Sequence, residues 1–268
     1  MNARYAIYFI PEPGTALARL GSALLGRDTE TGHAVAQPSF PGFSQERLHA
    51  LTANARRYGL HATLKAPFFL NQGMTERNLL LFAARFAGCR QAIILPRLEL
   101  ARIGSFFALV PSGKSPKEQE AIRDINALAA DAVSFFDPFR AAPSEQEIAR
   151  RNPQKLSTRQ RELLVVWGYP YVFEEYRFHI TLTGKLNENV ESDEMGKRLS
   201  SYLAAACNEP VAISGICICK QMTHVDLLMS DLHSGNTAAD FMPLKKFCFH
   251  HGKTRRTTGF KSWQHACS

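Results

Sequence analysis

Two histidines of this chain are each followed, two positions later, by a threonine, and the surrounding residues match as well. The first segment reads Tyr58-Gly-Leu-His61-Ala-Thr63-Leu64, and the second reads Tyr176-Arg-Phe-His179-Ile-Thr181-Leu182. A chance second copy around another histidine has odds on the order of one in a thousand at average residue frequencies. We therefore interpret the two segments, whose histidines lie 118 positions apart, as one structural half present twice.

Each segment is expected to place its histidine and threonine on the same face of a strand. Residues i and i+2 of a β-strand point to the same side, so His61 and Thr63 share one face while the alternate residues enter the core. His179 and Thr181 repeat this arrangement. Polar groups are costly to bury without partners, and we therefore predict a groove with one polar stripe on each side. Lys65 and Lys185 extend these stripes, and both are candidate substrate-binding groups together with Tyr58 and Tyr176.

These residue types suit acid–base chemistry on a phosphate. An imidazole titrates near neutral pH, so one histidine can accept a proton while the other donates one. The hydroxyls of Thr63 and Thr181 can donate to phosphate oxygens. We predict His61 and His179 as the catalytic pair in phosphodiester cleavage, with no metal and no cofactor; which of them is the acid stays open. The competing interpretation is that each is a core histidine with satisfied hydrogen bonds.

Other catalytic patterns are missing from the sequence. It contains no Gly-x-Ser-x-Gly elbow, no Gly-x-Gly-x-x-Gly loop and no Walker loop, which argues against serine hydrolases, nucleotide cofactors and kinase chemistry. The six cysteines are scattered without Cys-x-x-Cys spacing, so we expect reduced thiols.

Composition indicates a globular protein, and its charge slightly favours an anionic ligand. The 268 residues are 45% hydrophobic and 21% charged, which fits one large domain or two lobes. There is no apolar run of membrane-spanning length and no apolar signal at the N-terminus, so we predict a cytoplasmic protein that does not bind membranes. The net charge of +8 favours a phosphate-bearing ligand.

Strands and helices are predicted in an irregular order. Strands are expected at Ala3–Ile10, Tyr58–Phe69, Ile93–Leu100, Arg102–Val110, Arg177–Lys185, Val211–Cys219 and Phe241–Phe249, with a further candidate at Val225–Met229. Helices are expected before Gly26, after Ser44, and over Glu76–Gly88, Lys117–Val133 and Ser192–Cys207. The segment Asp137–Pro170, with four prolines and two short helical patches, is interpreted as a connector or lid. This order favours an α+β fold with an antiparallel sheet.

At the two His-x-Thr segments the chain resembles the two-histidine (2H) phosphoesterase superfamily. More narrowly it resembles a bacterial branch of phosphonate metabolism proteins, through Arg4–Tyr8, Leu25–Asp28, Tyr58–Phe68, Asp137–Arg140 and Trp167–Glu175. The resemblance implies a bilobal, pseudo-symmetric α+β fold with antiparallel sheets lining a central cleft and helices outside. It also implies metal-independent opening of cyclic phosphodiesters, with a ribose cyclic phosphate as the suggested substrate.

From the residues and this resemblance we predict one bilobal domain over residues 1–249, followed by a basic, disordered tail at 250–268. The first lobe is expected at about 1–136, the connector at about 137–170 and the second lobe at about 171–249. The predicted function is a cyclic phosphodiesterase, acting as a monomer on a small phosphorylated substrate. Two alternatives stay open: a non-catalytic protein that binds a phosphorylated ligand or RNA end, and nucleic-acid binding through the tail, which is less favoured.

Overall fold

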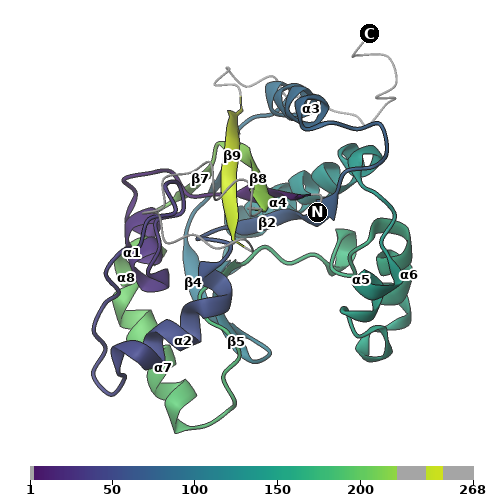
Figure 1. Ribbon diagram of the computed structural model, residues 1–268. Coiled ribbons are helices and arrows are strands. Elements are labelled where there is room, and N and C mark those ends of the chain that lie inside the picture. The colour runs from purple at the N-terminus through teal and green to yellow at the C-terminus, as the bar shows by residue number, and fades with distance from the viewer. Residues whose placement is uncertain (1–2, 222–239, 250–268) are drawn as a thin grey trace.

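The protein is built around one antiparallel sheet (Figure 1). A computed structural model describes residues 3–221 and 240–249. Its seven-stranded sheet has the order β4 (Leu98–Ile103), β5 (Phe106–Pro111), β6 (Ile180–Thr181), β2 (Ala62–Phe69), β1 (Arg4–Phe9), β8 (Gly215–Gln221) and β9 (Phe241–Cys248). A separate pair joins β3 (Ile93–Leu95) to β7 (Val211–Ile213). The α+β class with antiparallel pairing is confirmed.

The two strands that carry the threonines are neighbours at the centre of this sheet. The order of the strands shows that each half of the sheet combines both halves of the chain. β4 and β5 follow the first His-x-Thr segment in sequence, yet β5 pairs with β6 of the second. β8 and β9 follow the second segment, yet β8 pairs with β1, which lies beside β2.

Helices cover one face of the sheet and bury most of the core there. They are α1 (Ala16–Leu25), α2 (Gln45–Arg56), α3 (Glu76–Gly88), α4 (Pro116–Phe135), α7 (Val190–Tyr202) and α8 (Ala204–Asn208). Side chains from all six pack in one cluster with Ile7, Phe9, Ala62, Leu64 and Ile180 of the sheet. Alternation along the strands puts these apolar residues on the helix side. The opposite face holds a smaller apolar cluster around Tyr8 and Phe241, and the polar residues of the two segments lie on that face.

Capping residues explain why the helices begin and end where the sequence predicts. Ser44 and Thr75 each accept a hydrogen bond from the third backbone amide of the following helix, and Thr75 forms a reciprocal capping box with Asn78. Gly26 ends α1 with φ of 75°, a left-handed conformation that glycine adopts without steric cost. These helix boundaries are confirmed.

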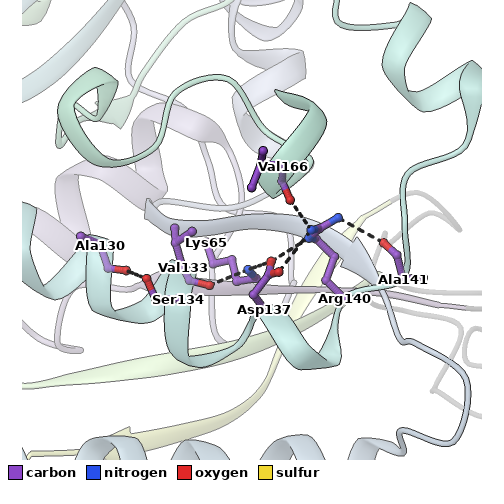
Figure 2. A network of polar contacts seen from close by, with 8 residues as sticks. All are labelled: Lys65, Ala130, Val133, Ser134, Asp137, Arg140, Ala141 and Val166. Atoms are coloured by element: carbon purple, nitrogen blue, oxygen red, sulfur yellow. Dashed lines mark hydrogen bonds and ion pairs between the residues drawn. The ribbon is translucent and has the colours of Figure 1, made fainter. Parts of the chain in front are cut away.

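The segment between the two halves forms the short helices η1 (Asp137–Phe139), α5 (Glu145–Ala149), η2 (Pro153–Lys155), α6 (Thr158–Trp167) and η3 (Phe173–Glu175). Of these, α5 and α6 lie to one side of the sheet in Figure 1. A polar network fastens this segment to the sheet (Figure 2). The ammonium of Lys65 on β2 contacts the Asp137 carboxylate at 3.2 Å, and Arg140 bridges Asp137 at 2.8 Å to the Val166 carbonyl at 2.9 Å.

Two expected strands are shorter than the alternation predicts, and each has a local cause. The expected strand at 93–100 is interrupted at Pro96, which has no amide to donate, so β3 and β4 enter different sheets. The expected strand Arg177–Lys185 shrinks to β6, because the amides of Leu182 and Thr183 both donate to the Phe107 carbonyl. The expected helix Ser192–Cys207 divides into α7 and α8.

Two predicted features lie outside the described residues: the candidate strand Val225–Met229 and the basic tail at 250–268. Within residues 3–221 and 240–249, no helix combines the length and the apolar character that a bilayer crossing requires.

Candidate active site

The sheet brings the two His-x-Thr segments side by side. Ala62 of β2 pairs with Ile180 of β6 in antiparallel register. Continuing this register by one residue places His61 opposite Thr181, and Thr63 opposite His179. Side chains directly opposite across such a pair start about 5 Å apart, and diagonal neighbours about 7–8 Å apart. The two histidines are diagonal neighbours on one face, close enough to reach a single phosphate group.

Both imidazole rings are held in the same way by backbone carbonyls. The Nδ1 atom of His61 lies 2.8 Å from the Gly59 carbonyl oxygen, and Nδ1 of His179 lies 2.7 Å from that of Arg177. A carbonyl oxygen only accepts, so Nδ1 carries the proton in each ring. The Nε2 atom of each neutral ring is thereby left unprotonated and available to exchange a proton with a ligand.

His61 lies in an aromatic, desolvated environment. Its ring centroid is 4.0 Å from that of Tyr8 and 5.9 Å from that of Tyr58. Burial lowers the pKa of His61 to about 4; the hydrogen bond to Gly59 opposes this shift, and the charge of His179 adds to it. His61 is therefore a neutral proton acceptor at pH 7.

His179 lies in a more open environment. Its hydrogen bond to the Arg177 carbonyl is exposed to solvent. The ring of Phe106 on β5 lies beside it, with centroids 6.0 Å apart. The influence of its charge on His61 shows that the two rings are electrostatically coupled.

The threonine hydroxyls can serve a ligand. Thr63 and Thr181 are both half-buried, and within the described part of the chain neither hydroxyl has a hydrogen-bond partner. Two donors on adjacent strands, each opposite a histidine, are well placed for the non-bridging oxygens of a phosphate. No three His, Cys, Asp or Glu side chains among the described residues gather in a way that would hold a metal ion.

The two tyrosines at matching positions differ in what they contact. Tyr58 stacks on Phe241 of β9, with centroids 5.2 Å apart, and stays half-buried beside His61. Tyr176 is buried and donates its hydroxyl to the backbone carbonyl of Thr63 at 3.0 Å. Burial raises the pKa of Tyr176, so this hydroxyl remains protonated. Tyr58 therefore lies beside His61, whereas Tyr176 connects the two segments through its hydrogen bond to Thr63.

The two lysines are not brought to the histidines. Lys65 is 4% exposed, and its ammonium contacts the carbonyl of Val133 and the carboxylate of Asp137. The pairing of β1 with β2 shifts register between Thr63 and Lys65, which breaks the alternation that would place them on one face. Lys185 is exposed and lies beyond the end of β6.

Tyr8 is a site residue that the two segments themselves do not reveal. It is opposite Thr63 in the β1–β2 pairing, its ring packs on His61, and it is 1% exposed. Burial raises its pKa, so its hydroxyl is protonated. The signal in the sequence is the alternation of β1, which points Tyr8 away from the core residues Ile7 and Phe9.

Comparison with known proteins identifies a family but no activity. A family described as "Protein of unknown function (DUF1045)" matches residues 63–227. A ribose 1,5-bisphosphate phosphokinase PhnN from Janthinobacterium sp. (strain Marseille) is 39% identical over 222 residues, covering 81% of this chain and 47% of that protein. A protein of the same name from Laribacter hongkongensis (strain HLHK9) is 38% identical over 213 residues, covering 78% of this chain and 46% of that protein. The chain spans about half the length of these relatives.

Proposed function

We propose that this chain, which belongs to the DUF1045 family, is a phosphodiesterase that opens cyclic phosphates with His61 and His179. The observation that carries the proposal is the pairing of Ala62 with Ile180. This register supports a site in which two imidazoles and two threonine hydroxyls on one face of the sheet contact the same phosphate. Both Nδ1 atoms are occupied by carbonyls, which leaves both Nε2 atoms for the reaction.

The reaction needs one proton acceptor and one proton donor. A water molecule attacks phosphorus while Nε2 of one histidine takes its proton. The bond from phosphorus to one ring oxygen breaks, and Nε2 of the other histidine gives that oxygen a proton. The product is an acyclic phosphomonoester with a free hydroxyl, and solvent exchange restores both rings. Thr63 and Thr181 stabilise the charge on the non-bridging oxygens.

The different environments of the two rings support an assignment of their roles. His61 is neutral at pH 7 because burial lowers its pKa to about 4, and a neutral ring accepts a proton. We therefore assign His61 as the general base, and His179, which faces more open surroundings, as the general acid.

A phosphorylated ribose is the substrate class that the relatives support. Both carry the name of an enzyme for ribose 1,5-bisphosphate. We do not transfer the phosphokinase activity in that name, because the sequence has no Walker loop and spans about half of each relative. A role in phosphonate metabolism rests on the sequence resemblance.

The finer structural predictions belong to the same proposal. Membership of the 2H superfamily is supported by the two matching segments and by their adjacency in the sheet. Pseudo-symmetry is supported by the presence of one His-x-Thr segment in each half of the sheet. The two segments meet at the Ala62–Ile180 pair.

The proposal can be tested with the full chain and a panel of cyclic phosphates, including ribose and nucleoside 2′,3′-cyclic forms. Phosphorus NMR would detect ring opening in the presence of a chelator. Changing His61→Gln or His179→Gln should lower kcat/KM by roughly 100-fold or more. The matched control is His33→Gln, since His33 is exposed and lies outside the site.

The second candidate is a protein that binds a phosphorylated ligand without turning it over. The half-buried threonine hydroxyls, which are free to donate within the described residues, favour ligand binding in either case. A wild-type protein that binds members of the panel but opens none would support this candidate against the enzyme.

A further inference from the structure

A cavity of about 190 Å³ opens between the sheet and the α5–α6 segment. Its lining joins distant parts of the chain, including Arg4 of β1, Tyr58 beside the first histidine, and Arg150 and Arg151 after α5. None of the sequence patterns predicts that these residues line one cavity, because Arg150 and Arg151 lie in the connector, far from Arg4 and Tyr58 in the sequence.

The cavity carries an excess of positive charge. Three arginines line it, against the single carboxylate of Glu147. That carboxylate is engaged in a capping box, with the Ser144 amide at 3.0 Å and the Ser144 hydroxyl at 3.2 Å. Within residues 3–221 and 240–249, none of the three guanidinium groups takes part in an ion pair. Several positive charges without carboxylate partners around one small space are suited to an anion.

Two of the three arginines, Arg4 and Arg151, make contacts that leave guanidinium donors without a partner among the described residues. Arg4 donates through Nε to the side chain of Gln221 at 2.8 Å, and its guanidinium lies 5.7 Å from the centre of the Phe241 ring. The guanidinium of Arg151 lies 4.8 Å from the centre of the Tyr169 ring. Stacking on an aromatic ring orients a guanidinium while its N–H groups remain able to bind an oxyanion.

The cavity adjoins the proposed active site. Tyr58 lines the cavity and also lies 5.9 Å, between ring centroids, from His61. Arg4 precedes Tyr8 by four positions on β1, so the two residues share a face of the strand, and Tyr8 packs on His61. A small molecule with one phosphate between the histidines can therefore extend along Tyr58 into the cavity.

We infer that this cavity is a second anion subsite, which binds a phosphomonoester on the molecule whose cyclic phosphate is opened by His61 and His179. This inference rests on the proposed function for the first phosphate. It narrows the substrate class to a sugar cyclic phosphate that carries a second, monoester phosphate. Free inorganic phosphate shares the chemistry of that group, so the test must distinguish the two sources.

The test compares two substrates that differ only in the second phosphate. Methyl ribofuranoside 2′,3′-cyclic phosphate would be assayed with a hydroxyl and with a phosphate at the 5-position. The wild-type protein should prefer the phosphorylated form by about 10- to 100-fold in kcat/KM, as expected for charge-assisted hydrogen bonds. The double variant Arg150→Gln/Arg151→Gln should reduce this preference to about twofold or less.

A matched control removes a positive charge elsewhere. Arg123 is exposed on α4 and does not line the cavity, so Arg123→Gln should keep the full preference. Ribose 5-phosphate binding, measured by calorimetry, gives a readout that does not depend on turnover. The double variant should bind it at least tenfold more weakly than the control variant does.

The outcomes separate the two proposals. Equal kcat/KM for both substrates in the wild type would overturn the subsite and leave the phosphodiesterase standing. Failure to open either substrate, with arginine-dependent binding of ribose 5-phosphate, would support the subsite and count against the phosphodiesterase. Binding of inorganic phosphate as tightly as ribose 5-phosphate, without a substrate preference, would reduce the cavity to a site for the free ion and overturn the subsite.

Discussion

The two His-x-Thr segments share four residues at the same offsets but occupy different environments. His61 precedes the eight-residue strand β2 and packs against Tyr8 and Tyr58. His179 precedes the two-residue strand β6 and keeps a solvent-exposed hydrogen bond. A duplicated pattern can therefore place two groups of the same type in different surroundings. Acid–base catalysis by such a pair needs one ring that accepts a proton and one that donates a proton.

The largest expected effect is on activity, when each of the two imidazole rings is removed in turn and substrates with different leaving groups are compared. An aryl phosphodiester such as bis(4-nitrophenyl) phosphate releases a stable phenolate that needs no protonation. We expect His179→Gln to retain most of its activity on this diester, whereas His61→Gln should lose roughly 100-fold or more in kcat.

Both variants should be strongly impaired on a sugar cyclic phosphate, whose alkoxide leaving group requires an acid. Steady-state kinetics on the two substrates would check this assignment, with His33→Gln as the control. The reverse pattern, in which only His61→Gln tolerates the aryl substrate, would exchange the roles of the two histidines.

The next effect concerns the threonines, which the sheet places opposite the histidines of the other segment. Thr63→Val and Thr181→Val each keep the size of the side chain but remove a donor to a phosphate oxygen. We expect each to lower kcat/KM by about 100-fold, since this is the usual effect of losing one such donor. A loss confined to one of them would show that the phosphate is held by a single segment.

Acid should reveal the burial of His61 through the stability of the fold. Because the pKa of His61 falls from 6.5 in the unfolded chain to about 4 in the fold, the unfolded chain binds the extra proton between these values. The stability contributed by neutral His61 is complete above pH 6.5 and is lost as the pH falls through about 4. The loss should reach roughly 3 kcal/mol.

Urea unfolding of wild type and His61→Gln across pH 4–7 would measure this contribution as the difference between the two proteins. The matched comparison is His179→Gln, which keeps His61 and should keep the acid-dependent loss. Parallel stability curves for wild type and His61→Gln would refute the role of burial at His61.

The smallest effect concerns the paired tyrosines. Tyr176→Phe removes a buried hydrogen bond to the Thr63 carbonyl and should lower the free energy of unfolding by about 1 kcal/mol. Tyr58→Phe, at the matching position of the first segment, should change it by less than about 0.5 kcal/mol, because its ring contacts remain. Equal losses would mean that the two tyrosines have the same structural role.

Local signals were sufficient to predict much of this protein. Helix starts could be predicted because Ser44 and Thr75 cap their helices through nearby residues. The catalytic candidates could be named because a repeated His-x-Thr segment is visible in the chain. Both depend on residues close together in sequence.

The remaining features depend on contacts between distant residues. Alternation alone would put Lys65 on the face of Thr63, but the register shift between β1 and β2 breaks the pattern, and Lys65 joins Asp137 instead. The pairing of β2 with β6 also cannot be predicted from neighbouring residues, because the two strands lie more than a hundred residues apart in the sequence. The arginines of the cavity come together for the same non-local reason.

Each half of the sheet contains strands from both halves of the chain, and this arrangement affects folding during synthesis. The β4–β5 ribbon gains its inner neighbour only when β6 emerges, and β1 gains its outer neighbour only when β8 does. Until then, the growing chain exposes unpaired strand edges, which favour slow folding and intermolecular association. A nascent chain that ends before His179 lacks the second histidine, so the activity that we propose would begin only after most of the sheet can close.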